Sequence, residues 1–162
     1  MKTWEYLQFK LVENFRLFNQ KYRKKGKMNK TICIYHHKDL DGKASAAVVK
    51  LKYPDAIFKG WDYGDPLPEI EEGNDVIMVD ICLEEKSNKV DKFEPMLEIA
   101  KKAKSFIWID HHKTSIQKYQ ESKDKRKNDI QVFCQVGKAA CELSWEYFFT
   151  AEPMPLMIKL LG

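Results

Sequence analysis

The chain has 162 residues, of which 44% are apolar and 32% charged, and this length allows one hydrophobic core of ordinary size. No apolar run approaches the roughly 20 residues that a bilayer-spanning helix needs, and the first residues show no secretory signal. These features exclude an integral membrane protein and predict a soluble, cytoplasmic one. The net charge of +4 is too small to imply a nucleic-acid partner by itself.

Residues 3–22 carry apolar side chains at steps of three and four, the period of one helix face. They predict an amphipathic helix, followed by a basic run and then by Met28, directly before the first predicted strand. We therefore divide the chain into an N-terminal helical extension over 1–27 and a domain over 28–162. Two alternatives stay open: translation starts at Met28, or the extension docks on the domain, on a partner or on a nucleic acid.

From Thr31 onwards, short β-rich runs alternate with segments of helical spacing. This alternation is typical of an α/β domain with a mostly parallel sheet flanked by helices. The expected strands are 31–35, 56–61, 76–80, 105–109 and 130–134. The expected helices are 43–52, 94–104, 114–121 and 138–149. The polar stretch 122–129 is expected to be a surface loop.

Cysteines and basic clusters give weaker indications. The four cysteines form no C-x-x-C pair, so we expect buried reduced thiols at Cys33, Cys82, Cys134 and Cys141. Basic residues concentrate within 23–27 and 123–127. These clusters could attract a phosphate-rich substrate, although solvated loops are the slightly favoured interpretation.

Metal-ligand chemistry follows three of the predicted strands. The first strand runs into His36-His37-Lys38-Asp39-Leu40-Asp41-Gly42, the third ends at Asp80, and the fourth runs into Asp110-His111-His112. Ligands of open parallel sheets bind outside the carboxyl ends of the strands, so these side chains are expected to meet. A single aspartate at a strand end is more often a helix cap. However, all four histidines occur in two pairs, each beside aspartates, which argues against chance.

Carboxylates and imidazoles together suit Mn²⁺ or a similar borderline ion, with Mg²⁺ or Co²⁺ as alternatives. The Asp39-x-Asp41 spacing lets two carboxylates of one loop reach different ions, and a carboxylate such as Asp80 can bridge them. The sequence therefore predicts a hydrolytic site with two metal ions.

These stretches resemble motifs of the DHH phosphoesterase family in their order, separation and strand context. The resembling stretches are HHKDLDG with the small residues up to Ala47, then Val79-Asp80, then Ile109-Asp110-His111-His112, then GKAACELSWEYF over 137–148. The resemblance covers about 31–149 and implies a Rossmann-like fold.

The resemblance also implies roles for individual residues. His36 and Asp39 would hold one ion, Asp41 and His111 the other, and Asp80 would bridge them. Asp110 would orient its neighbours, and His112 would lie against the scissile phosphate. His37 is either a support behind the ligands or only a packing residue. The implied mechanism is attack at phosphorus by water held between the metals, without a covalent enzyme intermediate.

The resemblance fails at the end of the sequence, where family members continue with a further metal-binding aspartate and a substrate-gripping domain. We therefore expect an N-terminal fragment or truncated product, with weak or no activity unless a homo-oligomer or a separate C-terminal half completes it. The favoured function is manganese-dependent hydrolysis of a nucleotide or short oligonucleotide. The alternative is a non-catalytic nucleotide- or partner-binding module.

Overall fold

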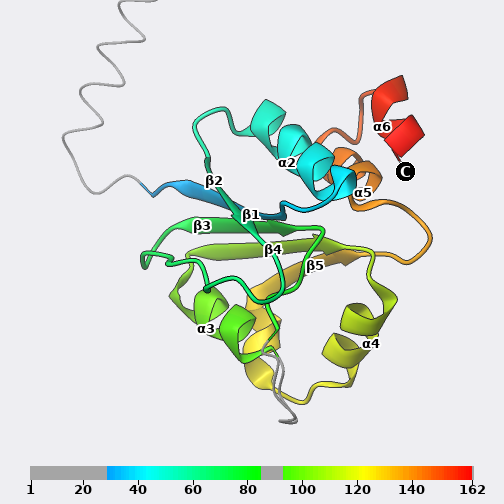
Figure 1. Cartoon of the computed structure of the whole chain (residues 1–162). Coiled ribbons are helices and arrows are strands. Elements are labelled where there is room, and N and C mark those ends of the chain that lie inside the picture. Colours follow the sequence, from blue (N-terminus) through cyan, green and yellow to red (C-terminus); the bar gives the residue numbers. More distant parts are fainter. Residues whose placement is uncertain (1–28, 85–92, 162) are drawn as a thin grey trace, which may run out of the picture.

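The computed structural model describes residues 29–84 and 93–161, which form a three-layer α/β domain (Figure 1). A five-stranded, fully parallel sheet lies in the middle, with helices on both faces. The predicted fold class is thereby confirmed. The helix expected over 3–22, and with it the extension over 1–27, lies outside the described residues.

The described elements follow one another in an alternating order. The strands are β1 (Thr31–His36), β2 (Ile57–Trp61), β3 (Asp75–Val79), β4 (Ser105–Asp110) and β5 (Ile130–Cys134). The helices are α2 (Leu40–Lys52), α3 (Glu94–Lys102), α4 (Lys113–Glu121), the 3-10 helix η1 (Lys125–Asp129), α5 (Ala140–Phe148) and α6 (Leu156–Leu161). The stretch expected to be a loop thus contains η1, and α2 begins three residues earlier than expected, directly after its cap Asp39.

The strand order is β2-β1-β3-β4-β5, which places β1 and β3 side by side in the sheet. From β1 the chain crosses to β2 on one side, whereas β3, β4 and β5 proceed on the other side. Such a reversal opens a crevice at the carboxyl ends of the two strands, where ligands of this architecture bind. The topology therefore selects one edge of the sheet for the functional site.

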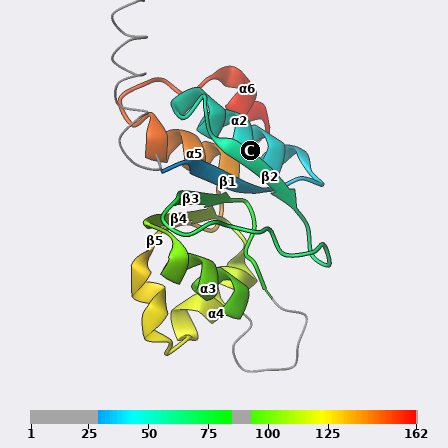
Figure 2. The ribbon, with the colours of Figure 1, turned by 90° about the vertical axis from the view of Figure 1, so that its left-hand side faces the viewer.

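Helices α3 and α4 cover one face of the sheet, and α2, α5 and α6 cover the other (Figure 2). An apolar cluster lies on each face. On one face, Met78 and Trp108 of the sheet pack with Met96 and Leu97 of α3. On the other face, strand residues pack with α2, α5 and α6 through side chains that include Val79, Ile109, Val49, Leu143 and Ile158. Neighbouring residues of a strand point to opposite faces, so runs that are buried on both sides read as continuous apolar stretches.

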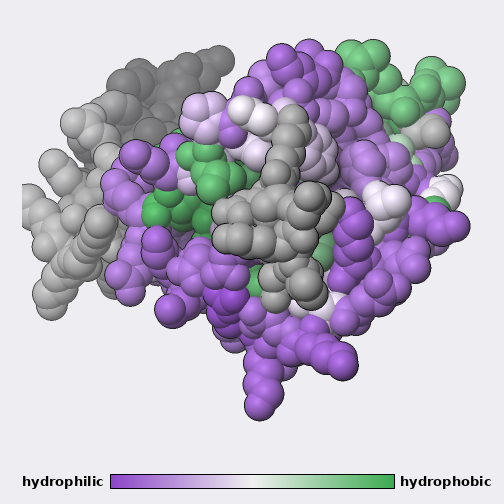
Figure 3. Space-filling view, turned by 60° about the horizontal axis from the view of Figure 1, so that its bottom comes forward, coloured by the Kyte–Doolittle hydropathy of each residue, from purple (hydrophilic) through white to green (hydrophobic). Residues whose placement is uncertain are grey.

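Hydrophilic residues predominate around a few apolar patches on the face turned forward in Figure 3. Among the described residues, no helix is long and apolar enough to cross a bilayer. All four cysteines are free, and three of them are buried, while Cys134 is partly exposed. The expected burial is thus found for Cys33, Cys82 and Cys141 but not fully for Cys134, and burial raises the pKa of Cys141 to about 12.

The basic cluster over 123–127 lies at the start of β5, the edge of the sheet opposite the strands' carboxyl ends. Arg126 binds Glu94, Glu98 and Asp124 at 2.6–2.8 Å, and Lys127 donates to backbone carbonyls of Gln120 and Ser122. These side chains fasten η1 to α3 and α4. They do not face the predicted site.

Candidate metal centre

Asp80 is the central residue of the candidate site. It follows β3 directly, its side chain is 1% exposed, and its backbone has a φ of 58°, the left-handed region that few residues other than glycine adopt. Neither carboxylate oxygen has a partner in hydrogen-bonding geometry among the described residues. Burial raises the pKa of Asp80 to about 6, against the lowering effect of the nearby His111. The chain thus holds a buried carboxylate whose oxygens need a cationic partner.

One group of donors lies on the β1 side of Asp80. It consists of His36, Asp39 and Asp80, whose potential ligand atoms all lie within 4.8 Å of one another. The Nδ1 atom of His36 is 2.8 Å from Asp39 Oδ2 and 3.6 Å from Asp80 Oδ2. This group brings together three residues that the sequence predicted to share a metal.

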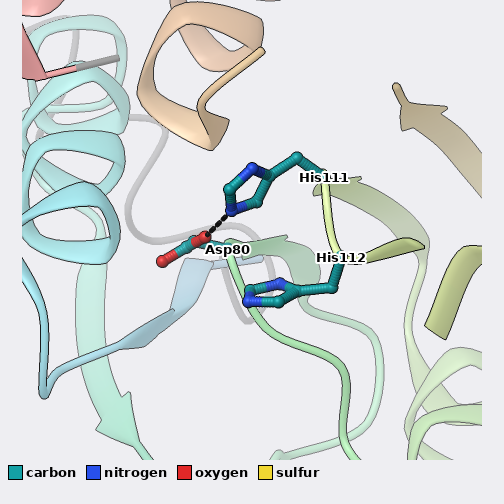
Figure 4. Close-up of side chains that lie close together, drawn as sticks. All are labelled: Asp80, His111 and His112. Carbon is teal, nitrogen blue, oxygen red and sulfur yellow. Dashed lines mark ion pairs between the residues drawn. The ribbon is translucent and has the colours of Figure 1, made fainter. Parts of the chain in front are cut away.

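A second group lies on the β4 side of Asp80 and consists of Asp80, His111 and His112. Figure 4 shows both imidazoles extending from the end of β4 toward the Asp80 carboxylate. His111 Nε2 is 3.3 Å from Asp80 Oδ1 and 3.5 Å from Asp41 Oδ2, and the Asp80 carboxylate raises the pKa of His111. Asp80 therefore belongs to both groups, the arrangement expected of a bridging ligand.

Asp110 orients the histidine pair from beneath. It is fully buried, and its Oδ1 accepts hydrogen bonds from the backbone amides of His111 and His112 at 2.7 and 3.3 Å. The same oxygen is 2.7 Å from His112 Nδ1, and this contact raises the pKa of His112 to about 9. His112 therefore carries a positive charge at neutral pH in the metal-free protein, with its other ring nitrogen available to a neighbouring group.

Two ligand candidates are also helix caps. Asp39 is the N-cap of α2, because its Oδ1 accepts from the Gly42 amide at 2.8 Å, while its Oδ2 faces His36. Asp41 accepts from the amides of Ala140 and Cys141 at 2.9 and 2.7 Å and thereby caps α5 from outside that helix. An ionised carboxylate has about four lone-pair positions, so capping and metal binding are compatible.

Gly42 is required for close approach. A Cβ atom at this position would lie 2.0 Å from the carbonyl oxygen of His36 and 2.7 Å from its Cβ. The absence of a side chain lets the start of α2 pack directly on the end of β1. The metal loop is thus folded back tightly enough for Asp39 and Asp41 to face the crevice.

Asp62 also lies beside the candidate site, and it was not among the residues predicted from the sequence. It follows β2 directly, and its Oδ1 is 3.2 Å from His36 Nε2. The signal was available, because a carboxylate directly after a strand was the criterion that selected Asp80. His37 does not reach either group of donors. Its Nε2 contacts Asp65 Oδ2 at 3.1 Å, in the turn that carries Asp62.

The donor set fits a divalent metal ion. Carboxylate oxygens and imidazole nitrogens converge from the ends of β1, β3 and β4, and none of the four cysteines belongs to either group. The buried oxygens of Asp80, which make no hydrogen bond of acceptable geometry with the described residues, provide the negative charge that a cation would neutralise. This donor set suits a divalent ion bound through oxygen and nitrogen, and it contains no thiolate.

The fold and the site together define a class of protein. It is a parallel α/β domain with carboxylates and imidazoles gathered at the point where the strand order reverses, as in metal-binding domains. The comparison with known families is specific within this class. The chain belongs to the DHH family, whose N-terminal domain matches residues 31–161. This membership places the chain in a phosphoesterase family whose domains depend on metal ions.

One curated relative shares part of the sequence. A segment of 64 residues is 38% identical to Uncharacterized protein R106 of Acanthamoeba polyphaga mimivirus, and it covers 40% of this chain and 14% of that protein. The match therefore spans only a small part of the relative. No solved structure gives a significant match.

Proposed function

We propose that the chain hydrolyses phosphate esters of a nucleotide or short oligonucleotide with the help of two divalent ions, Mn²⁺ in the first place. The observation that carries the proposal is that two groups of donors share the buried Asp80 carboxylate, whose oxygens make no hydrogen bond of acceptable geometry with the described residues. Two adjacent ions are a recurrent requirement of phosphoester hydrolysis, and one carboxylate between them is the usual means of holding them close.

His36, Asp39 and Asp80 would hold one ion. Asp80 and His111 would hold the other together with Asp41, whose Oδ2 is 3.5 Å from His111 Nε2, and His112, the third member of the second group, would face the phosphate. When bound, such ions polarise the phosphate and lower the pKa of an attacking water. The chain's own contribution is to fix the donors. Asp110 locks the two histidines through three contacts, and the helix-cap bonds of Asp39 and Asp41 fix those carboxylates relative to α2 and α5.

His112 would bind the phosphate group. Its imidazole is 38% exposed, and the buried carboxylate of Asp110 keeps it protonated and oriented. A fixed positive charge at the mouth of the site stabilises the negative charge that grows on phosphate oxygens during displacement, and its proton can pass to the leaving oxygen. Asp110 is therefore proposed to act through His112 and not on the substrate.

A small substrate is favoured over a long strand. The basic side chains of 123–127 that the structure describes lie at the opposite edge of the sheet, and Arg126 is already paired with three carboxylates. They do not extend the site into a basic path of the kind that long nucleic acids follow. We therefore expect a dinucleotide to inhibit hydrolysis of a test substrate more strongly than a long single strand does at the same concentration of nucleotides.

The test is hydrolysis of bis(p-nitrophenyl) phosphate by the chain with added Mn²⁺. We expect turnover that depends on the ion and is lost in Asp80→Asn, while Asp55→Asn, an exposed aspartate at the opposite end of β2, keeps it. Circular dichroism establishes that each variant is folded. A folded chain that binds Mn²⁺ without any turnover would overturn the proposal in favour of a non-catalytic binding module.

A further inference from the structure

Asp62 makes a directed contact with a predicted metal ligand from outside both donor groups. Its Oδ1 is 3.2 Å from His36 Nε2 in hydrogen-bonding geometry, and its side chain is 26% exposed. Strand pairing produces this contact, because His36 and Trp61 are register partners in β1 and β2. The residue that follows Trp61 therefore lies beside the ring at the end of β1.

The two nitrogens of His36 face different surroundings. Nδ1 is buried and points toward Asp39 Oδ2 and Asp80 Oδ2, but it makes no hydrogen bond of acceptable geometry with any described residue. Nε2 has the Asp62 carboxylate as its acceptor. A neutral imidazole carries one N–H, and a carboxylate can only accept. Asp62 thus offers Nε2 an acceptor in hydrogen-bonding geometry, whereas Nδ1 faces two carboxylates without such geometry. With a cation between Nδ1 and those carboxylates, the proton belongs on Nε2 and the lone pair of Nδ1 faces the ion.

A small network holds Asp62 in place. The Asp62 amide donates to Asp65 Oδ2 at 3.0 Å, and the Asp65 amide donates to the Asp62 carbonyl at 2.9 Å, which closes a turn. Trp61 Nε1 donates to the Asp65 carbonyl at 3.2 Å, and His37 Nε2 contacts Asp65 Oδ2 at 3.1 Å. His37 is thus linked to His36 through Asp65 and Asp62, by three contacts.

We propose that Asp62 is a positioning residue that fixes the tautomer and orientation of His36, so that Nδ1 serves as the ligand of the first ion. The metal-binding part of this inference rests on the proposed function, whereas the tautomer is a property of the chain alone. Carboxylates behind ligating histidines commonly have this role, and their removal weakens metal binding about 10- to 100-fold.

The first measurement is the tautomer of His36 in the metal-free chain, by long-range ¹H–¹⁵N NMR at about pH 8.5, where imidazole is normally neutral. We expect the Nε2–H form in the wild-type chain and a mixture of tautomers in Asp62→Ala. Asp62→Asn, which keeps an acceptor oxygen, should retain most of the Nε2–H form. A wild-type His36 with its proton on Nδ1 would overturn the proposal without any variant having to fold.

The second measurement is calorimetric titration with Mn²⁺. We expect the tighter binding step to weaken about 10- to 100-fold in Asp62→Ala and by only a few-fold in Asp62→Asn. The matched control Asp55→Ala, at the far end of β2, should bind as the wild type does. Unchanged affinity in Asp62→Ala contradicts the role of Asp62. If the wild-type chain binds no Mn²⁺, the proposed function is wrong. The NMR measurement of the His36 tautomer then still shows whether Asp62 orients His36.

Discussion

Asp80 combines features that each cost free energy in the folded chain. Its backbone is left-handed, its side chain is buried, and its oxygens have no hydrogen-bond partner among the described residues. Strained and poorly satisfied residues persist where function requires them, because the surrounding structure holds them in place. We therefore attribute the unfavourable free energy of Asp80 in the metal-free protein to the function of the site.

Replacing Asp80 with Asn should stabilise the metal-free chain. The folded-state pKa of about 6 lies above the ordinary value of 3.8, so the folded chain favours protonated Asp80 and loses stability as the pH rises through about 6. A shift of this size corresponds to roughly 2–3 kcal/mol at pH 7.5. Asn tolerates the left-handed backbone and carries no charge.

The prediction can be checked by urea unfolding of both chains in EDTA. At pH 7.5 Asp80→Asn should be the more stable, and the difference should shrink toward pH 4. A variant that is less stable than the wild type at pH 7.5 without metal would show that Asp80 is structurally satisfied, contrary to its geometry.

Gly42→Ala should destabilise the chain by roughly 2 kcal/mol or more. Inside most helices such a change is favourable by roughly 0.5–1 kcal/mol, because alanine is the better helix former. Here the new methyl group would meet the His36 carbonyl at 2.0 Å, and this backbone cannot move without displacing the ring. The sign of the effect is therefore reversed.

Urea unfolding measures the loss for Gly42→Ala, and Mn²⁺ titration reports the displacement of His36. The control is Ala47→Gly at an exposed position of α2, which should cost only about 1 kcal/mol and leave metal binding intact. If Gly42→Ala is as stable as the wild type, the close approach of α2 and β1 is not a constraint.

At the scale of elements, α5 begins without a capping side chain on its own N-cap residue, Ala139. Its first amides are satisfied by two acidic residues. Asp41 of α2 accepts from Ala140 and Cys141, and Glu142 accepts from the Ala139 amide at 3.0 Å. Asp41 thus joins two helices that pack on the same face of the sheet and contributes to the site from the same carboxylate.

Asp41→Ala should destabilise the metal-free chain by about 1–2 kcal/mol, because an orphaned helix N-terminus costs this much. Asp41→Asn keeps one acceptor oxygen and should lose less. Amide hydrogen exchange at Ala140 and Cys141 in EDTA localises the effect, with exchange at these positions accelerated in Asp41→Ala. Unchanged protection would show that the cap contributes nothing without a metal.

For the whole molecule, binding of ions to the folded chain should add to its stability. A ligand at about 100 times its Kd stabilises the folded state by about 2.7 kcal/mol if the unfolded chain does not bind it. For a chain of this size we expect Mn²⁺ to raise Tm by about 5–10 °C and EDTA to reverse the rise. Differential scanning calorimetry of the wild type and of Asp80→Asn tests this, since only the wild type should respond.

Much of this molecule could be predicted from its sequence. Buried parallel strands read as short apolar runs, and β5 has the bounds that were expected. The residues around Asp80 could be predicted because each follows a strand in a compact motif, HHKDLDG or IDHH. The parallel sheet then brings those strand ends together, so local patterns were sufficient to predict which carboxylates and imidazoles lie near Asp80.

The contacts that could not be predicted join residues far apart in the sequence, and they depend on which strands and helices are neighbours. Asp62 reaches His36 only because β2 pairs with β1, and no local pattern fixes that pairing. The partner of Asp41 at the start of α5 depends in the same way on the packing of two distant helices. Arg126 looked free in the sequence, but tertiary contacts with α3 occupy it.

The cap that Asp41 places on α5 also bears on the order of folding. Its hydrogen bonds join residues 99 and 100 positions apart, so forming them before the rest of the fold would cost the closure entropy of a loop of that length. Contacts of such long range form late, on the native side of the folding barrier, unless they belong to the nucleus. An ion bound through Asp41 would then leave the folding rate nearly unchanged but would lower the unfolding rate. The metal would therefore stabilise the chain only after the sheet has formed.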